Sequence, residues 1–445
     1  MYMNKMYQLF GAIIYFFGQH VTSVPESEKE YWFFDSKTAY DIVHGYDLKV
    51  PENCQIQQIF GVFRHGTRYG SKDDTKDMKK LLPFRKDLEK NANMPKEDIE
   101  AIQNWTIGVS DDINKDLNEQ GIQDMKKLSL RVKNAFGDIF QETFNTEIHK
   151  VLTSHETRAR QSGYHFLKNA FGKKINITSI DDLPMFEKTD VTLNIDKLRE
   201  KKLTKEEKAK QKALGTGPIT EMTKFQNSPI MLRTLENIAY KLGLKSPLRF
   251  EHGKAMYESC RLERAVNTGI TPPWCTVFCT LDLQVFEYLN DIGWYYKLGW
   301  GNPDGYRLGC PLLTRLNLSF KNAADRKGAK AVLYFGHRDN LFVVITILGL
   351  AKDDTALKAD NMDEMAKRKW RTSFINPFAA NMIAAFYSCN DNVDRVSFFL
   401  NEKLVPIELK DKKLCTLCDW KDVKEKFDKI TDDEKCTFGH VITAP

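Results

Sequence analysis

The stretch "IQQIFGVFRHGTRYG", residues 56–70, joins an apolar run to a polar turn that contains one histidine and two arginines. The run "IQQIFGVF" has the length and the aromatic and β-branched residues that are typical of a buried strand. The turn "RHGTRYG" follows without a break, and Gly66 within it lets a ligand approach the backbone closely. The turn is either a basic surface loop or the reaction centre of a phosphate site, and the rest of the chain decides between them.

Two further stretches repeat this design of apolar run, polar turn and helical pattern. The run "EIHKVLTS" precedes "HETRARQSGYHFLKNAF", and the run "AKAVLYFG" precedes "HRDNLFVVITILGL". Strands that alternate with helices predict an α/β fold whose sheet is mainly parallel and flanked by helices. Because ligands of such sheets bind beyond the carboxyl ends of the strands, we expect the three turns to meet in one crevice.

Length and periodicity predict more than one domain. At 445 residues the chain exceeds the usual size of a single hydrophobic core. Residues 171–320 show helical periodicity and few strand signals, so we expect an inserted helical domain or cap there. The α/β core then comprises residues 24–170 and 321–445. The composition, 42% hydrophobic and 28% charged, is that of a globular protein and excludes disordered and collagen-like classes.

The first residues predict a secretory signal peptide over residues 1–23. A lysine precedes an apolar core at residues 9–17, and Ser23 is the expected last residue before cleavage. The alternative is a membrane anchor, but a spanning helix needs about 20 apolar residues, and neither this core nor the run at residues 341–351 is that long. We therefore expect no stable membrane insertion. The ending "HVITAP" has no retrieval signal, so secretion or an endomembrane lumen is the expected location.

Glycosylation sequons and cysteines agree with that route. Acceptor sequons begin at Asn104, Asn176 and Asn317. Nine cysteines in an oxidising compartment form at most four bridges and leave at least one thiol over. The pair in "CTLC", Cys415 and Cys418, lacks a second pair of ligands at zinc spacing, so we expect a local disulfide or two separate bridges there and no metal.

The net charge of +6 suits a polyanionic small molecule as a partner. The lysine-rich segment at residues 199–212 interleaves glutamates, which is typical of a solvated helix, and no nucleic-acid recognition motif accompanies it. We therefore do not expect nucleic acid as a partner. The sequence carries no signal for the oligomeric state.

The three turns offer what phosphoryl transfer requires, which is a nucleophile, cations and an acid. His65 is the candidate nucleophile, provided that one ring nitrogen is unprotonated while the other donates to a carbonyl. Asp339 is the candidate general acid. The candidate phosphate ligands, with donors that match phosphate oxygens, are Arg64, Arg68, Arg158 and His337. Without a metal-ligand cluster, these side chains must supply the electrostatic stabilisation, and we expect no cofactor.

At these turns the sequence resembles a known family. "RHGTRYG" resembles the RHGxRxP signature of the histidine phosphatase superfamily, in its acid phosphatase and phytase branch. "TSHETRARQS" and "YFGHRDN" resemble the second and third phosphate-binding segments of that branch. The pattern is similar to the multiple inositol polyphosphate phosphatase family, which is echoed by "PWCTVF", "EYLNDIGWYYKLGWG", "INPFAANMI" and "FLNEKLVPI". The resemblance covers roughly residues 55–406.

The resemblance implies a phosphoglycerate-mutase-like core and an enzyme that removes phosphates from inositol polyphosphates, including phytate. It implies a covalent phosphohistidine at His65, with 2,3-bisphosphoglycerate as a further substrate to test. It also implies two disulfides, Cys54 to Cys389 and Cys260 to Cys275. The cysteines that it does not pair are Cys279, Cys310, Cys415, Cys418 and Cys436.

Three positions depart from the resembled pattern. Gly70 stands where the signature has proline, and we expect it to loosen the catalytic loop. Asp339 stands where the family has glutamate, and Arg338 stands where the wider acid phosphatase branch has its aspartate. Arg338 either adds a cation for a neighbouring substrate phosphate or points to solvent. Two alternatives to a polyphosphate phosphatase therefore stay open, a broad acid phosphatase for simple monoesters and a non-catalytic phosphate-binding relative.

Overall fold

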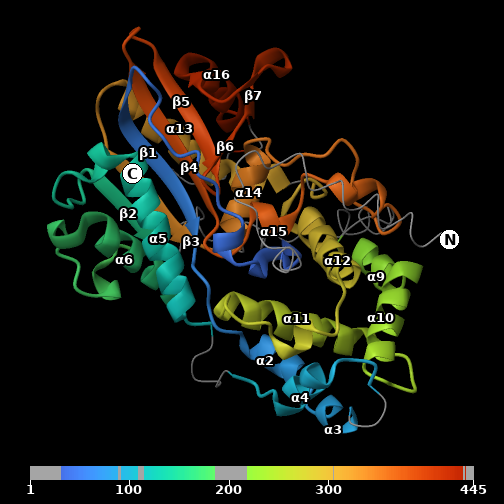
Figure 1. The fold of residues 1–445 in the computed structure, drawn as a ribbon. Helices are drawn as coiled ribbons and strands as arrows, with labels where there is room; N and C mark the ends of the chain where they lie inside the picture. Colours follow the sequence, from blue (N-terminus) through green and yellow to red (C-terminus); the bar gives the residue numbers. More distant parts are fainter. Residues whose placement is uncertain are drawn as a thin grey trace.

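The computed structural model describes residues 32–88, 92–108, 115–185, 218–303, 305–433 and 436. The predicted signal peptide, residues 1–23, lies outside them. One central sheet organises the fold, with helices on both of its faces and the strand order β2-β3-β1-β4-β5-β6, to which β9 is added beside β5 (Figure 1). Its strands are β1 (Cys54–Arg64), β2 (His149–Thr153), β3 (Ala331–Gly336), β4 (Asn381–Cys389), β5 (Asp394–Leu400), β6 (Lys403–Val405) and β9 (Cys418–Asp419). A separate pair joins β7 (Ile407–Glu408) to β8 (Leu414–Cys415).

The half of the sheet that carries the three motifs is parallel. β3 lies between β1 and β2 and pairs in parallel with both. The register places Arg64 opposite Gly336 and Thr153 opposite Phe335, so the three strands end at the same edge. The predicted parallel pairing is confirmed for these strands. β4, β5, β6 and β9 extend the sheet with antiparallel pairs, as the short turn between β4 and β5 requires.

Two layers of helices cover the sheet. Successive residues of β1 point to opposite faces, so Ile59 and Phe63 belong to one apolar cluster while Phe60 and Val62 belong to another. The first cluster is covered by α5 (Glu119–Ala135) and α6 (Thr157–Phe171). The second is covered by α13 (Cys310–Ala324), α14 (Arg338–Ile347) and α16 (Trp420–Thr431). Both layers are visible around the sheet in Figure 1.

The remaining helices form a helical part beside the sheet edge where the motifs end (Figure 1). They include α2 (Lys72–Lys79), α3 (Phe84–Asp87), α4 (Lys96–Asn104), α9 (Pro218–Gln226), α10 (Pro229–Lys241), α11 (Phe250–Val266) and α12 (Thr280–Leu298), with the short α15 (Thr372–Ile375) next to α12. α2, expected in the core, packs against α11, whereas α13, expected in the insertion, packs on the sheet. One apolar cluster runs through the helical part and the sheet face without a break, because each amphipathic helix buries its stripe on the nearest apolar surface.

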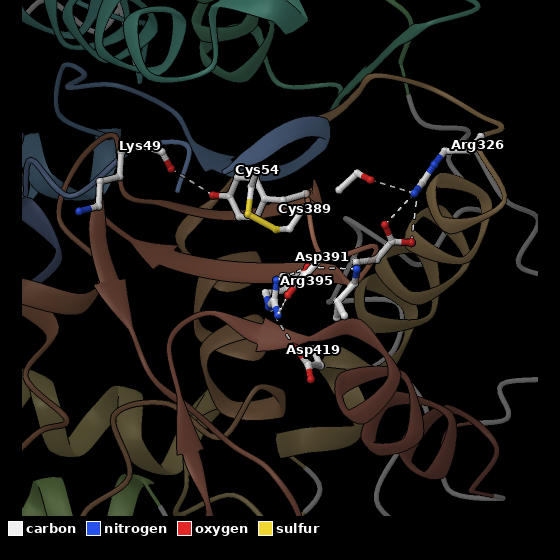
Figure 2. The surroundings of a disulfide bond; sticks show 11 residues. Lys49, Cys54, Arg326, Cys389, Asp391, Arg395 and Asp419 are labelled. Carbon is white, nitrogen blue, oxygen red and sulfur yellow. Dashed lines mark hydrogen bonds and ion pairs between the residues drawn. A yellow bond between two sulfur atoms is a disulfide. The ribbon is translucent and has the colours of Figure 1, made fainter. Parts of the chain in front are cut away.

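Four disulfides link the described chain. Cys54 at the start of β1 is bonded to Cys389 at the end of β4, where the two residues are register partners (Figure 2). Cys260 of α11 is bonded to Cys275. Both pairs are those that the family resemblance implies. The pairs that the sequence left open are Cys310 with Cys436 and Cys415 with Cys418, and the free cysteine is Cys279.

The three sequons lie in different surroundings. Asn104 at the end of α4 and Asn176 are exposed, as a glycan requires. Asn317 is 2% exposed, and its amide donates to Asp428 Oδ1 at 2.8 Å. The prediction of a glycan at Asn317 is therefore wrong for the folded chain, because a tripeptide pattern does not report which face of α13 turns inward. Within the part of the chain that the structure describes, we find no helix that could span a membrane.

Candidate active site

The three polar turns meet at the carboxyl edge of β1, β2 and β3. The main chain of His65 donates to the carbonyl of Gly336 at 3.1 Å, and the main chain of Ser154 donates to that of Phe335 at 2.9 Å. The rings of His65 and His337 lie edge to face, with centroids 5.7 Å apart. Arg158 Nη2 is 3.4 Å from His337 Nδ1. The residues that the sequence singles out at the three turns are therefore brought together in one place.

His65 has the protonation pattern that a nucleophilic imidazole needs. Its side chain is buried, and Nδ1 lies 2.8 Å from the carbonyl oxygen of Gly66. A carbonyl only accepts, so Nδ1 carries the proton and Nε2 keeps its lone pair. Burial, followed by the charges of Arg64 and Arg158, holds the pKa of His65 well below its usual range. The ring is therefore neutral, with Nε2 available for attack.

His337 has the opposite tautomer. It caps α14, and its side chain accepts from the main-chain N–H of Asn340, so that Nδ1 is the acceptor and Nε2 carries the proton. Ser154 Oγ lies 2.9 Å from this Nε2. Burial, followed by Arg158 and Arg64, lowers the pKa of His337 to about 3. The two rings therefore offer different groups, one a lone pair and the other an N–H donor.

Arg64 is held from behind by main-chain carbonyls. Its Nη1 donates to the oxygens of Ser36, Asn376 and Pro377 at 2.5, 2.8 and 2.8 Å, and its guanidinium stacks on Phe378 at 4.7 Å. Its Nε is buried and finds no acceptor among the described residues. A buried donor without a partner costs free energy, so this side of the guanidinium is suited to an incoming anion.

Arg158 and Arg68 complete the cluster of cations. Arg158 Nη1 pairs with Glu156 Oε2 at 2.7 Å, while its buried Nε finds no acceptor in the described chain. Arg68 Nη1 donates to its neighbour's carbonyl at 2.6 Å and lies 3.8 Å from Asp74 Oδ2. Burial lowers the pKa of Arg68 to about 10, so it remains charged at neutral pH. The arrangement can stabilise the charge of a phosphoryl group without a metal.

The loop that carries His65 is supported by α5, which the sequence analysis did not single out. The main-chain N–H and the hydroxyl of Thr67 both donate to Asp124 Oδ2, at 2.9 and 2.6 Å. Gly66 packs on Gly121 so closely that a Cβ at Gly66 would lie 2.5 Å from the carbonyl oxygen of Gly121. The sequence signal that could have identified this support is the spacing of three residues: Asn118 caps α5, Gly121 lies one turn into the helix, and the buried Asp124 follows three residues later.

The profile of the histidine phosphatase superfamily, branch 2, matches residues 55–401, a range that contains all three turns. The chain belongs to this superfamily. Multiple inositol polyphosphate phosphatase 1 of Drosophila melanogaster is 31% identical over 420 residues, which cover 90% of this chain and 85% of the relative. The family resemblance read from the motifs is thereby confirmed.

Solved structures share the fold of this histidine phosphatase. The phytase from D. castellii matches with a TM-score of 0.72 at 18% identity, over 95% of this chain and 92% of that one. The multiple inositol polyphosphate phosphatase of Bifidobacterium longum, solved in complex with inositol hexasulfate, matches with a TM-score of 0.66 at 15% identity, over 89% of this chain and 97% of that one. At these identities the likeness concerns the fold alone.

Gly70 lies in a part of the histidine phosphatase loop that main-chain pairing holds in place. Tyr69 donates to the carbonyl of Asp116 at 2.9 Å, and Lys115 donates to that of Gly70 at 3.1 Å. A Cβ at Gly70 would lie 2.9 Å from Leu262 Cδ2, so a larger residue requires that side chain to move. The missing proline is thus partly offset by backbone hydrogen bonds. Whether Gly70 lowers activity stays a prediction.

Asp339 and Arg338 share the first turn of α14, next to His337. Asp339 is half-buried, and its Oδ1 lies 3.6 Å from Arg338 Nε. The turn therefore places a carboxylate beside the histidine that closes the site, while its role as the acid stays a prediction. The guanidinium of Arg338 stacks over the ring of Trp294 at 4.1 Å, so it does not simply point to solvent.

Proposed function

We propose that this histidine phosphatase hydrolyses the phosphomonoesters of inositol polyphosphates, phytate included, through a phosphohistidine at His65. The observation that carries the proposal is the 2.8 Å contact between His65 Nδ1 and the Gly66 carbonyl, which leaves the Nε2 lone pair free beside the buried Arg64 and the partly buried Arg158. The curated relative of 31% identity is named for this activity, which supports inositol polyphosphates as the substrate class.

In the first step His65 Nε2 attacks phosphorus, the ester P–O bond breaks, and Asp339 protonates the leaving oxygen of the inositol. Arg64, Arg158 and Arg68 bind the equatorial oxygens, and His337 donates its Nε2–H to one of them. The bound dianion offsets the positive charges that keep His65 neutral, and so stabilises the positively charged ring of the phosphohistidine.

In the second step water attacks the phosphorus of the phosphohistidine. The Asp339 carboxylate formed in the first step takes the proton from this water. The N–P bond then breaks, inorganic phosphate leaves, and His65 returns to its starting tautomer. Each turnover consumes one water, releases one inorganic phosphate and leaves a hydroxyl group on the inositol in place of the phosphate.

We also propose that the enzyme acts outside the cytosol, either secreted or in an endomembrane lumen. Four disulfides among the described residues support this location, because such bonds persist in oxidising compartments. The predicted signal peptide points the same way. The expected glycans are those at the exposed Asn104 and Asn176.

The test is phosphate release from phytate in the presence of a metal chelator. We expect wild-type activity to persist and the His65→Ala variant to lose at least about a thousandfold in kcat. His44→Ala is a matched control, because His44 Nδ1 also lies 3.0 Å from the carbonyl of the next residue. Activity retained by His65→Ala would show that another group is the nucleophile.

Asp339→Asn and a second substrate separate the remaining alternatives. As the general acid, Asp339 matters most when the leaving oxygen is a poor leaving group, so Asp339→Asn should slow phytate hydrolysis far more than aryl phosphate hydrolysis. A wild type with equal kcat/KM for both substrates would favour a broad acid phosphatase. Wild-type binding without turnover would favour a non-catalytic relative. 2,3-Bisphosphoglycerate belongs in the same substrate panel.

A further inference from the structure

We propose that Arg338 is a specificity-determining residue that binds a second phosphate of the substrate, next to the phosphate that His65 attacks. This inference rests on the proposed function and deepens it. The ligand is a phosphate group on the same polyphosphorylated molecule, so a substrate with a single phosphate makes no contact with Arg338.

The first observation is how Arg338 and Arg64 are placed around one residue. Arg64 Nη1 donates to the main-chain oxygen of Ser36 at 2.5 Å, and Arg338 Nη1 donates to the hydroxyl of the same serine at 3.3 Å. Burial, and then the charge of Arg338, hold the pKa of Arg64 well below its usual range, as expected for two cations this close. Arg338 therefore lies beside the cation that faces the scissile phosphate.

The second observation is the aromatic platform that fixes the plane of Arg338. Its guanidinium lies 4.1 Å above the ring of Trp294 in α12. Trp294 stacks on Phe342 with centroids 5.1 Å apart, and Phe342 stacks on Trp370 with centroids 5.4 Å apart. A guanidinium held by its face keeps most of its N–H edge accessible. Apart from the 3.3 Å contact of Nη1 with Ser36 Oγ, that edge can bind phosphate with two parallel hydrogen bonds.

The third observation is that the charge of Arg338 is only weakly neutralised. Among the described residues, Asp339 is the acidic side chain within ion-pairing distance, and the 3.6 Å from its Oδ1 to Arg338 Nε is longer than a hydrogen bond. The nearby carboxylate of Asp35 is engaged by Arg261. The pair between Arg158 and Glu156 is much shorter, at 2.7 Å. Arg338 thus offers a nearly free positive charge.

The fourth observation is exposure. The side chain of Arg338 is 36% exposed, whereas Arg64 is 2% exposed. The two cations therefore form an inner and an outer position. A phosphomonoester needs only the inner one. A ring that carries phosphates on neighbouring carbons places a second dianion outside the first, within reach of Arg338.

The experiment compares Arg338→Ala with wild type on phytate and on an aryl phosphate. We expect kcat/KM for phytate to fall roughly 10- to 100-fold, the loss of a charged hydrogen-bond donor, while the value for the aryl phosphate stays within about threefold. Lys297→Ala is the matched control, because it removes a cation that lies 4.8 Å from the same Trp294 ring, and it should change neither substrate. Trp294→Leu should mimic Arg338→Ala in part, since it removes the platform.

An equal loss on both substrates would overturn the inference, because Arg338 would then act on the chemistry through its neighbour Asp339. An unchanged kcat/KM for phytate would overturn it as well. If wild type hydrolyses the aryl phosphate but not phytate, the proposed function is wrong, but that result does not decide the role of Arg338. The inference is then decided by phytate as a competitive inhibitor of aryl phosphate hydrolysis, whose inhibition constant must rise at least about tenfold in Arg338→Ala.

Discussion

The two ends of strand β1 are built on opposite principles. At Cys54 the strand is tied to β4 by a disulfide, and the charges nearby are exposed ion pairs, such as Arg395 with Asp391 and Arg326 with Asp394 (Figure 2). At the other end Arg64 is buried without a carboxylate partner among the described residues, and main-chain oxygens and the ring of Phe378 hold it. The first end adds stability, and the second retains charge that only an anion can neutralise.

The two ends of β1 differ in how their charged groups contribute to the free energy of unfolding. Solvent screens the exposed pairs, so each contributes little whether or not it forms. A buried cation without a counter-charge destabilises the fold, and a ligand that binds only the folded state restores that free energy. The disulfide at the far end of the strand offsets part of the destabilisation at the site. Four changes test this contrast.

The largest effect should come from the disulfide. The double variant Cys54→Ser with Cys389→Ser opens a loop between residues 335 positions apart, which should lower the free energy of unfolding by about 6 kcal/mol on the chain-entropy model. Denaturant unfolding measures the loss. The kcat per folded molecule should not change at low temperature. A parallel loss of kcat would mean that the two ends of β1 are coupled.

Two arginines that both pair with a carboxylate should behave differently. Arg158, 2.7 Å from Glu156, faces the site, so Arg158→Ala should lower kcat/KM for phytate about 100- to 1,000-fold. Arg395 pairs as closely with Asp391 at the far end, yet Arg395→Ala should leave both kcat/KM and the melting temperature nearly unchanged. Steady-state kinetics and thermal melts decide. Similar kinetic losses in both variants would contradict the contrast.

Two glycines provide the next comparison. Gly66→Ala places a methyl group 2.5 Å from the backbone of α5, so the catalytic loop must shift, at about 1 to 3 kcal/mol of stability and with reduced kcat. Gly137→Ala meets no atom within 4 Å and should be neutral. Melting temperatures and kcat of both variants, measured side by side, test the close packing. A neutral Gly66→Ala would show that the loop tolerates displacement.

The smallest effect should appear in the pH profile. Burial, followed by Arg158 and Arg64, lowers the pKa of His337 to about 3, and the pKa of His65 is lowered in the same direction. His337 gains a proton only below this value, so in the free enzyme its ring stays neutral as the pH falls from 7 to about 4. The kcat/KM for an aryl phosphate, corrected for ionisation of the substrate, should therefore show no loss from protonation of His337 in this range. An acid limb near pH 6 that disappears in His337→Ala would contradict this assignment.

Local patterns predicted the parts of the molecule that depend on neighbours in the chain. The three strand-and-turn units, the parallel pairing of their strands and the meeting of His65, Arg64, Arg158 and His337 all follow from runs of fewer than about 30 residues. Patterns that carry no information about burial did not predict which surface a helix faces. Asn317 of the third sequon points inward in α13, and α2 joins the helical part because α11 offers the nearest apolar surface.

By itself the sequence determined the candidate nucleophile, the candidate phosphate-binding cations and the edge of the sheet where they gather, since a side chain's chemistry and its place after a strand are local properties. The tertiary structure alone decided which protein groups hold those side chains. Arg64 is held by the carbonyls of Ser36, Asn376 and Pro377. Asp124 accepts from the loop that carries His65, and the ring of Trp294 supports Arg338. Most of these partners are far apart in the chain. The physical reason is that main-chain carbonyls and ring faces leave no periodic signal, so their positions emerge only when the sheet and the helical part close around the site.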